Sequence, residues 1–408
     1  MSTLIPLQEP ATTRPAAPSW QAFLELGFRP LYLAGAAWSL LAVLIWIYAP
    51  QLLAGTLAGL PWHAHEMLWG FVATIAVGFL LTAGANWTGI TPLAGTPLGA
   101  LLALWVVARV GYLLPQAAAF WTAAVADTLF FVVAAAAMGR AIWRARNRRN
   151  YPVPLMMLGL GLAHVGFLVA LVGLDDWALA LRGFHAGLGV MALIALLVAR
   201  RVIPFFAMRA VPGLQIPMHE RSGQWQLAAA AVAVAAVLAG WGWLQAAALA
   251  LAGGLALWQV LAWRPAAVRG RPLLWILYAG YSGLGVGLLV SAAQAIGAAL
   301  PSALSVHLVS MAGFSTLIIG MLTRTALGHL GRGLVLDDSM VASYWLVIGA
   351  VALRLAALWP SAAGGWLLQA SAACWVAAFA TYLWRFTPWM IRPRPDRPVP
   401  PPPPPRKT

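Results

Sequence analysis

Long apolar segments, repeated along nearly the whole chain, restrict this sequence to a membrane fold. A helix needs about 20 apolar residues to cross the ~30 Å hydrocarbon layer of a bilayer. Each run is continuous rather than alternating, which favours α-helices, whose backbone polar groups bond within the segment, over a β-barrel. Twelve such runs cover residues 30–48, 65–85, 93–115, 119–143, 153–174, 177–199, 225–243, 244–263, 273–296, 303–327, 340–359 and 364–386.

The composition supports the same fold class. Hydrophobic residues make up 62% of the 408 residues and charged residues only 9%, too few polar side chains to cover a water-soluble globule. The least certain boundary is the one between the seventh and eighth runs, where only residues 240–242 separate them. We therefore expect an all-α polytopic protein, with a cytoplasmic N-terminal segment (1–27), a twelve-helix membrane domain (28–386) and a Pro-rich basic cytoplasmic tail (387–408).

The distribution of positive charge predicts how the chain crosses the membrane. The net charge is +15, but nearly all Lys and Arg residues lie near the termini or in alternate connections, around residues 140–149, 200–221, 264–271 and 324–332. The other connections carry none. This is the positive-inside pattern, so we expect both termini in the cytoplasm and basic loops that contact anionic lipid, in a bacterial inner membrane. A nucleic-acid partner is not expected.

Neither end of the sequence predicts a further folded unit. Residues 1–19 are polar and contain no apolar core, which argues against a cleaved signal peptide. Six consecutive prolines (400–405) among basic residues predict an extended tail. Because Cys374 is the single cysteine, an internal disulfide and a c-type haem attachment are both excluded.

Three histidines recur at similar positions in the chain. His65, His185 and His307 lie 120 and 122 residues apart, each near the start of an apolar run that contains glycines. The spacing predicts three pseudo-repeated units of four helices, with one imidazole per unit in the outer half of the bilayer. Because ionisable groups at that depth are costly, they are by default functional. We interpret them as ligands of haem or copper, although an interhelical hydrogen bond would also account for each one.

The segment Trp62-His-Ala-His-Glu66 holds the densest group of metal-capable side chains. If a helix begins at Pro61, His63 and His65 point ~200° apart and cannot bind one metal together; an irregular turn would allow it. Glu66 could orient a ligand or transfer protons, or simply favour the helix dipole.

Other charges within the apolar runs are Arg109, Asp127 and Arg354. Arg109 and Asp127 have matching depths in neighbouring helices, which predicts an ion pair; Arg109 could alternatively contact a haem propionate. Arg182, close to His185, could bind a propionate or another anion, or be a loop charge. His164, midway along the fifth run, has a weaker claim to a functional role than the three recurring histidines.

Six segments of the chain carry a family resemblance: GFRPLYLAGA (27–36), WHAHEMLWGF (62–71), GFLLTAGANWTG (78–89), RVIPFF (201–206), LLWILYAGYSGLGVGLL (273–289) and HLVSMAGFSTLIIGMLTRTALGHLGR (307–332). They resemble segments of the NnrS family. The resemblance spans most of the chain and implies a polytopic inner-membrane protein that binds haem and copper and is linked to nitric oxide metabolism or nitrosative stress. It marks His63, His65, Glu66, His185, His307, Arg324 and His329 as motif positions. Family members often have a histidine where this chain has Tyr278.

The leading hypothesis is therefore a haem- and copper-binding membrane protein that acts on nitric oxide or an iron–nitrosyl species. The candidate haem-binding residues are His65, His185, His307, Arg109 and Arg182, and the candidate metal ligands are His63, His65, His185, His307 and Glu66. A secondary transporter is the alternative, because helix repeats broken by glycine suit alternating access. A haem or copper handling factor without turnover is a third.

Overall fold

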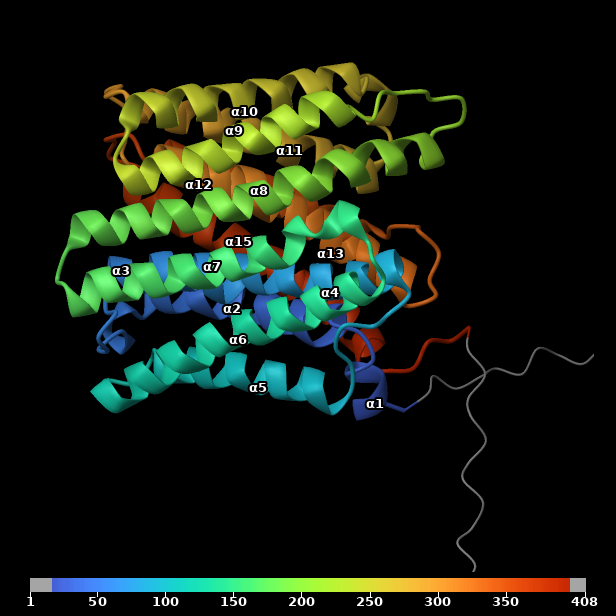
Figure 1. Cartoon of the computed structure of the whole chain (residues 1–408), viewed down its shortest axis with the longest axis horizontal. Coiled ribbons are helices and arrows are strands. Elements are labelled where there is room, and N and C mark those ends of the chain that lie inside the picture. Colours follow the sequence, from blue (N-terminus) through green and yellow to red (C-terminus); the bar gives the residue numbers. More distant parts are fainter. Residues whose placement is uncertain (1–16, 397–408) are drawn as a thin grey trace, which may run out of the picture.

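A computed structural model describes residues 17–396. Within this range the chain is helical and contains no strand, so the predicted all-helical polytopic class is confirmed. The helices lie side by side along the long axis of the molecule, with α5 and α6 at one edge and α9 and α10 at the other (Figure 1). Most of the predicted N-terminal segment (1–16) and the end of the Pro-rich tail (397–408) lie outside the described residues.

The first third of the chain begins with a short helix and then forms four spans. Its elements are α1 (Trp20–Phe23), α2 (Phe28–Tyr48), η1 (Pro50–Leu52), α3 (Leu60–His65), η2 (Glu66–Ala73), α4 (Thr74–Thr88), α5 (Thr96–Gly111) and α6 (Ala117–Arg144). The elements α3, η2 and α4 form one continuous span, Leu60–Thr88, in which η2 is a π-helix.

The middle third forms the next four spans. They comprise η3 (Arg148–Asn150), α7 (Pro152–Leu168), the π-helix η4 (Val169–Gly173), α8 (Trp177–Ala210), α9 (Glu220–Ala239) and α10 (Gly242–Ala262). The uncertain division between the seventh and eighth runs is resolved as two helices. Gly240, with a φ of 73°, ends the first of them in the left-handed conformation that glycine adopts most readily.

The last third contains η5 (Pro265–Val268), α11 (Pro272–Ala295), α12 (Leu304–His307), the π-helix η6 (Leu308–Ser315), α13 (Thr316–His329), α14 (Asp338–Ala356) and α15 (Gly364–Met390). Proline opens several helices of the bundle, as in α3, α7 and α11. That position suits proline because the first helical N–H groups have no partner within the helix.

Eleven helical spans of the described chain are long and apolar enough to cross a bilayer, which makes this a multi-pass membrane protein. The third predicted run, residues 93–115, is the exception: its helix α5 has only 16 residues. Gly95 has a φ of 60° and starts the helix late, and the helix gives way to a turn at Tyr112. The predicted run was longer because apolar residues continue through both flanking turns.

Three spans form the centre of the bundle. They are Leu60–Thr88, α8 and the span Leu304–His329, and each contacts the other two through η2, α8 and η6. Glycine allows these helices to approach closely. A Cβ atom on Gly187 of α8 would lie 2.9 Å from the Trp69 ring of η2, so only glycine fits at this crossing. These are the spans that carry His65, His185 and His307.

Helix α11 packs against the third central span through glycines on one face. Cβ atoms on Gly280 and Gly287 would lie 2.7 Å and 2.8 Å from the backbone nitrogens of Leu317 and Val309, and one on Gly283 would clash with the Ala312 carbonyl. Backbone atoms cannot move aside as a flexible side chain can. The order of these contacts shows that α11 runs antiparallel to its partner.

We predict that Gly283→Ala destabilises the protein, because the added methyl group forces α11 away from η6. Overpacking of this kind typically costs about 1–3 kcal/mol. Gly254→Ala in α10 is the matched control, since no atom lies within 4 Å of the position that its new methyl group would occupy. The thermal midpoint of detergent-purified protein should fall for Gly283→Ala and stay equal or rise for Gly254→Ala; equal midpoints would contradict the packing described here.

Candidate metal and cofactor sites

A cavity of about 400 Å³ opens among the central spans, near the end of the bundle where the connections lack Lys and Arg. Its walls come from α2, α3, η2, α7, α8, α12, η6, α14 and α15, and most of them are apolar. His63, His185 and His307 all line it. The structure thus brings three imidazoles from the three central spans to one space.

His185 and His307 have the same local geometry. Nδ1 of His185 lies 2.8 Å from the Leu181 carbonyl oxygen, and Nδ1 of His307 lies 2.8 Å from the Ala303 carbonyl oxygen. Because a carbonyl oxygen only accepts, each Nδ1 carries the ring proton and each Nε2 keeps its lone pair. A metal-binding histidine is commonly oriented in this way, by a hydrogen bond from its other nitrogen.

The third histidine of the cavity, His63, is held by stacking. Its ring lies parallel to Trp46 of α2, with the centroids 4.8 Å apart and the planes 14° from parallel. Its Nδ1 is buried and has no hydrogen-bond partner among the described residues. Arg354, in the last turn of α14, adds a positive charge to the wall.

A second group of polar side chains is fully enclosed beside the cavity. Glu66, the first residue of η2, accepts hydrogen bonds from Trp38 Nε1 at 2.6 Å, Arg109 Nη1 at 2.6 Å and His65 Nδ1 at 2.8 Å. All four side chains come from different positions on α2, the second span and α5. Glu66 and His65 have no exposed surface, and Arg109 is 1% exposed.

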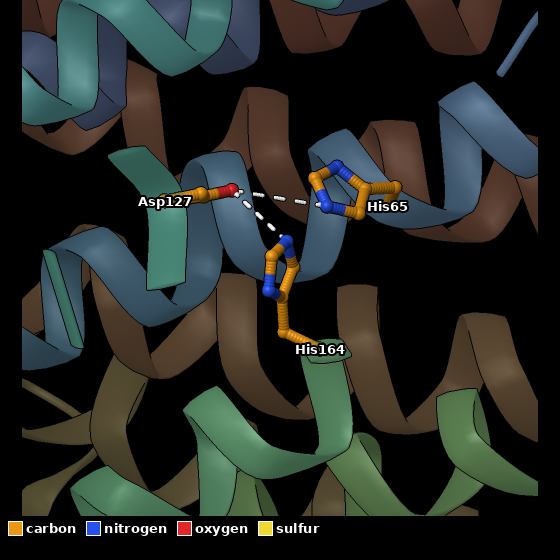
Figure 2. A group of neighbouring side chains, drawn as sticks. All are labelled: His65, Asp127 and His164. Atoms are coloured by element: carbon orange, nitrogen blue, oxygen red, sulfur yellow. Dashed lines mark ion pairs between the residues drawn. The ribbon is translucent and has the colours of Figure 1, made fainter. Parts of the chain in front are cut away.

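The same enclosed group extends to α6 and α7 through Asp127. Its Oδ2 pairs with Arg109 Nη2 and lies 3.5 Å from His164 Nε2 and 3.8 Å from His65 Nε2. Figure 2 shows both rings directed at this carboxylate from two other helices. The Tyr112 hydroxyl lies 3.2 Å from His164 Nε2. We call His65, Glu66, Arg109, Asp127 and His164 the enclosed cluster.

Local sequence explains why the cavity and the enclosed cluster are adjacent. Helix α3 begins at Leu60 with Pro61 in its first turn, so His63 and His65 project from nearly opposite sides of one helical turn. Gly70 then makes room for the enclosed cluster: a Cβ there would meet Arg109 Nη1, and would lie 2.6 Å from Glu66 Oε2 and 2.8 Å from Trp38 Nε1.

The structure separates the candidate residues into three groups. His63, His185 and His307 meet at the cavity, whereas His65, Glu66 and Arg109 belong to the enclosed cluster. The expected ion pair between Arg109 and Asp127 is confirmed. Arg182 lies outside both sites, beside the α9–α10 turn, where a Cβ atom added to Gly240 would lie 3.6 Å from its guanidinium carbon.

Sequence reasoning underrated several residues of these sites. His164 ranked below the recurring histidines because it falls outside their spacing, yet it faces Asp127. Arg354 was noted only as a charge within an apolar run, and Trp38 and Tyr112 were not noticed as site residues at all. Depth in the bilayer would not have found them either, because Tyr112 lies directly after α5 whereas Asp127, near it in space, lies ten residues after the start of α6.

Comparison with known protein families assigns residues 22–394 to NnrS, described as NnrS protein. This match covers nearly the whole chain. The chain belongs to the NnrS family. The resemblance noted for the motif segments is thereby confirmed, and a search of curated proteins gives no match. Both the cavity and the enclosed cluster lie within the matched residues, and the NnrS segment 62–71 supplies His63 to one and His65 and Glu66 to the other.

We predict that Arg109→Met strongly destabilises this NnrS protein. It would leave Glu66 and Asp127 buried without their shared cation, and removing one partner of a buried pair typically costs about 3–5 kcal/mol. Arg385→Met is the matched control, because Arg385 pairs with Asp337 at 2.5 Å on the surface, where such a pair contributes about 0–1 kcal/mol. Thermal midpoints in detergent should fall much further for Arg109→Met. Equal losses would show that the enclosed ion pairs are energetically unimportant.

Proposed function

We propose that this NnrS-family protein binds haem and copper in the bacterial inner membrane and acts in nitric oxide metabolism or resistance to nitrosative stress. The observation that carries the proposal is the meeting of His63, His185 and His307, from three separate spans, at one apolar cavity. Polar side chains are unfavourable inside a membrane, so three histidines that come together from distant parts of the sequence favour a shared ligand.

The residues of the cavity fit a haem. A volume of about 400 Å³ is in the ordinary range for small-molecule and cofactor sites, which are mostly apolar with a few directed polar groups. His185 and His307 would offer their Nε2 lone pairs to the haem iron, with each ring held in place by the Leu181 or Ala303 carbonyl. Arg354 offers a cation to a propionate, the role first considered for Arg109 and Arg182.

Copper fits the remaining imidazole. His63 has an unpartnered buried Nδ1, and imidazole is a common copper ligand. The Trp46 ring stacked on His63 fixes the plane of the imidazole and keeps water from one of its faces. Met67 and Met311 contribute polarisable sulfur atoms to the same wall.

A bound haem would supply a redox-active iron that takes small diatomic ligands such as nitric oxide. The protein's own residues then bind and orient that group and exclude water. Apolar residues such as Phe167, Phe184 and Leu188 line the cavity and exclude water. An apolar substrate or an iron–nitrosyl species would enter from the end of the bundle at which the cavity lies.

The decisive measurement for this proposal is the visible spectrum and metal content of the purified full-length protein. We expect a Soret band and bound copper in the unmodified chain, loss of most of the Soret absorbance in His185→Ala and His307→Ala, and no change in the control His219→Ala. His219 precedes α9 and is far from the cavity in the sequence and in its contacts. A protein without haem or copper, or one whose spectrum is indifferent to both cavity variants, would overturn the proposal.

We also propose the membrane orientation and the threefold repeat expected from the sequence. Connections at the cavity end carry no Lys or Arg, whereas most of those at the other end contain or adjoin Arg residues, which supports a cavity that faces the periplasm and termini that face the cytoplasm. Two features support a repeat of four helices. The second, sixth and tenth spans form the centre, and a π-helix directly follows both His65 and His307.

Cysteine labelling tests the orientation. In a Cys374→Ala background, Ser361→Cys at the cavity end should react with a membrane-impermeant maleimide in intact cells, while Asn147→Cys at the basic end should react only after the membrane is opened. Both positions lie in connections between spans. The reverse pattern would contradict the proposed topology.

A further inference from the structure

In the enclosed cluster, a ring nitrogen of His65 and a carboxylate oxygen of Asp127 face each other without a hydrogen bond between them. Nδ1 of His65 donates to the Glu66 carboxylate, which can only accept, so Nε2 of His65 bears a lone pair. That Nε2 is buried, has no hydrogen-bond partner among the described residues, and faces Asp127 Oδ2 at 3.8 Å. A lone pair directed at a carboxylate oxygen across this gap is unfavourable unless a cation lies between them.

His164 completes the arrangement from α7. Its Nδ1 lies 3.5 Å from the Thr128 hydroxyl, and its Nε2 lies 3.2 Å from the Tyr112 hydroxyl. The same Nε2 faces Asp127 Oδ2 at 3.5 Å and is the ring nitrogen available to an ion in that gap. One ligand atom from each of His65, Asp127 and His164 lies within 4.8 Å of the others.

We propose that His65, Asp127 and His164 form a binding site for a single divalent first-row transition-metal ion, separate from the cavity. Ligand atoms of a tetrahedral ion with bonds of about 2.0–2.1 Å lie about 3.3 Å apart. The two separations from Asp127 Oδ2, 3.5 Å and 3.8 Å, are close to this value, and the two ring nitrogens, which lie within 4.8 Å of each other, would approach on binding. Two imidazoles and one carboxylate suit this class of metal. The site goes beyond the proposed function and does not depend on it.

The surroundings of this site match those of known metal sites in two respects. The Glu66 carboxylate accepts a hydrogen bond from Nδ1 of His65, the nitrogen that faces away from the proposed ion. A carboxylate–histidine–metal arrangement of this kind fixes the orientation of the ring. The buried charges also favour binding of a further cation. Two buried carboxylates, Glu66 and Asp127, share the single guanidinium of Arg109, which leaves one negative charge without a partner of opposite sign. Asp127 Oδ1 remains unpartnered among the described residues and can serve as a second ligand atom.

The enclosed site is too small for a haem and takes one ion. Its three ligand residues have no exposed surface, and the Tyr112 hydroxyl adjoins them, 3.2 Å from His164 Nε2. The cavity, in contrast, is lined by His63 on the other side of the same helical turn. Each site can therefore be disabled without removing a residue of the other.

The test uses full-length protein in which the cavity histidines are removed together (His63→Ala, His185→Ala, His307→Ala). After chelator treatment, titration with Co²⁺ should fill one site per chain and produce visible d–d absorption bands. Adding His164→Gln to this background should abolish the bands, and adding the control His219→Gln should leave them unchanged. Glu66→Gln, a positioning variant, should weaken Co²⁺ binding about 10–100-fold.

Failure to bind one Co²⁺ in the cavity-deficient protein, or undiminished binding in correctly folded His164→Gln protein, would overturn the site. Size-exclusion chromatography reports folding. If His164→Gln does not fold, X-ray absorption spectroscopy of Co²⁺ bound to the cavity-deficient chain identifies the ligands of the ion. Coordination by two imidazoles and oxygen would support the site, and coordination by oxygen alone would overturn it. Because the cavity is already disabled, neither result bears on whether the cavity binds haem.

Discussion

The structure depends on one constraint: each charged side chain buried inside the bilayer must be paired with a charge of the opposite sign. Glu66, Arg109 and Asp127 come from three different spans and lie where water cannot stabilise them. Each would be strongly unfavourable alone, so the helices that carry them are stable only when assembled. Trp38 adds the first span to this group and His164 adds the fifth. The enclosed cluster thus links the first five spans of the chain.

Two histidines of one helical turn, His63 and His65, lie in two different environments. His63 faces the cavity and His65 lies in the enclosed cluster, because two residues along an α-helix rotate the side chain by ~200°. The π-helix η2 begins immediately after His65. Such segments are rare and are frequently found at functional sites, and here one places Glu66 against the outer nitrogen of His65.

Much of the fold was predictable from the sequence, because hydrophobic length and the need to satisfy backbone groups leave few alternatives in a membrane. The meeting of His185 with His307 was also expected, since equal spacing indicates equivalent positions. The choice between His63 and His65 was not, because it depends on where helix α3 begins, which apolar patterning does not reveal. His164 and Arg354 were underrated because their roles arise from contacts between helices distant in sequence.

Helix α5 has a physical consequence for the surrounding lipid. Its 16 residues span about 24 Å, less than the ~30 Å hydrocarbon thickness, and it lies at the edge of the bundle with Val106 and Val110 exposed on its surface. A bilayer adapts to a short span by thinning beside it. Thinning of this kind would bring lipid headgroups close to the helix that supplies Arg109 to the enclosed cluster.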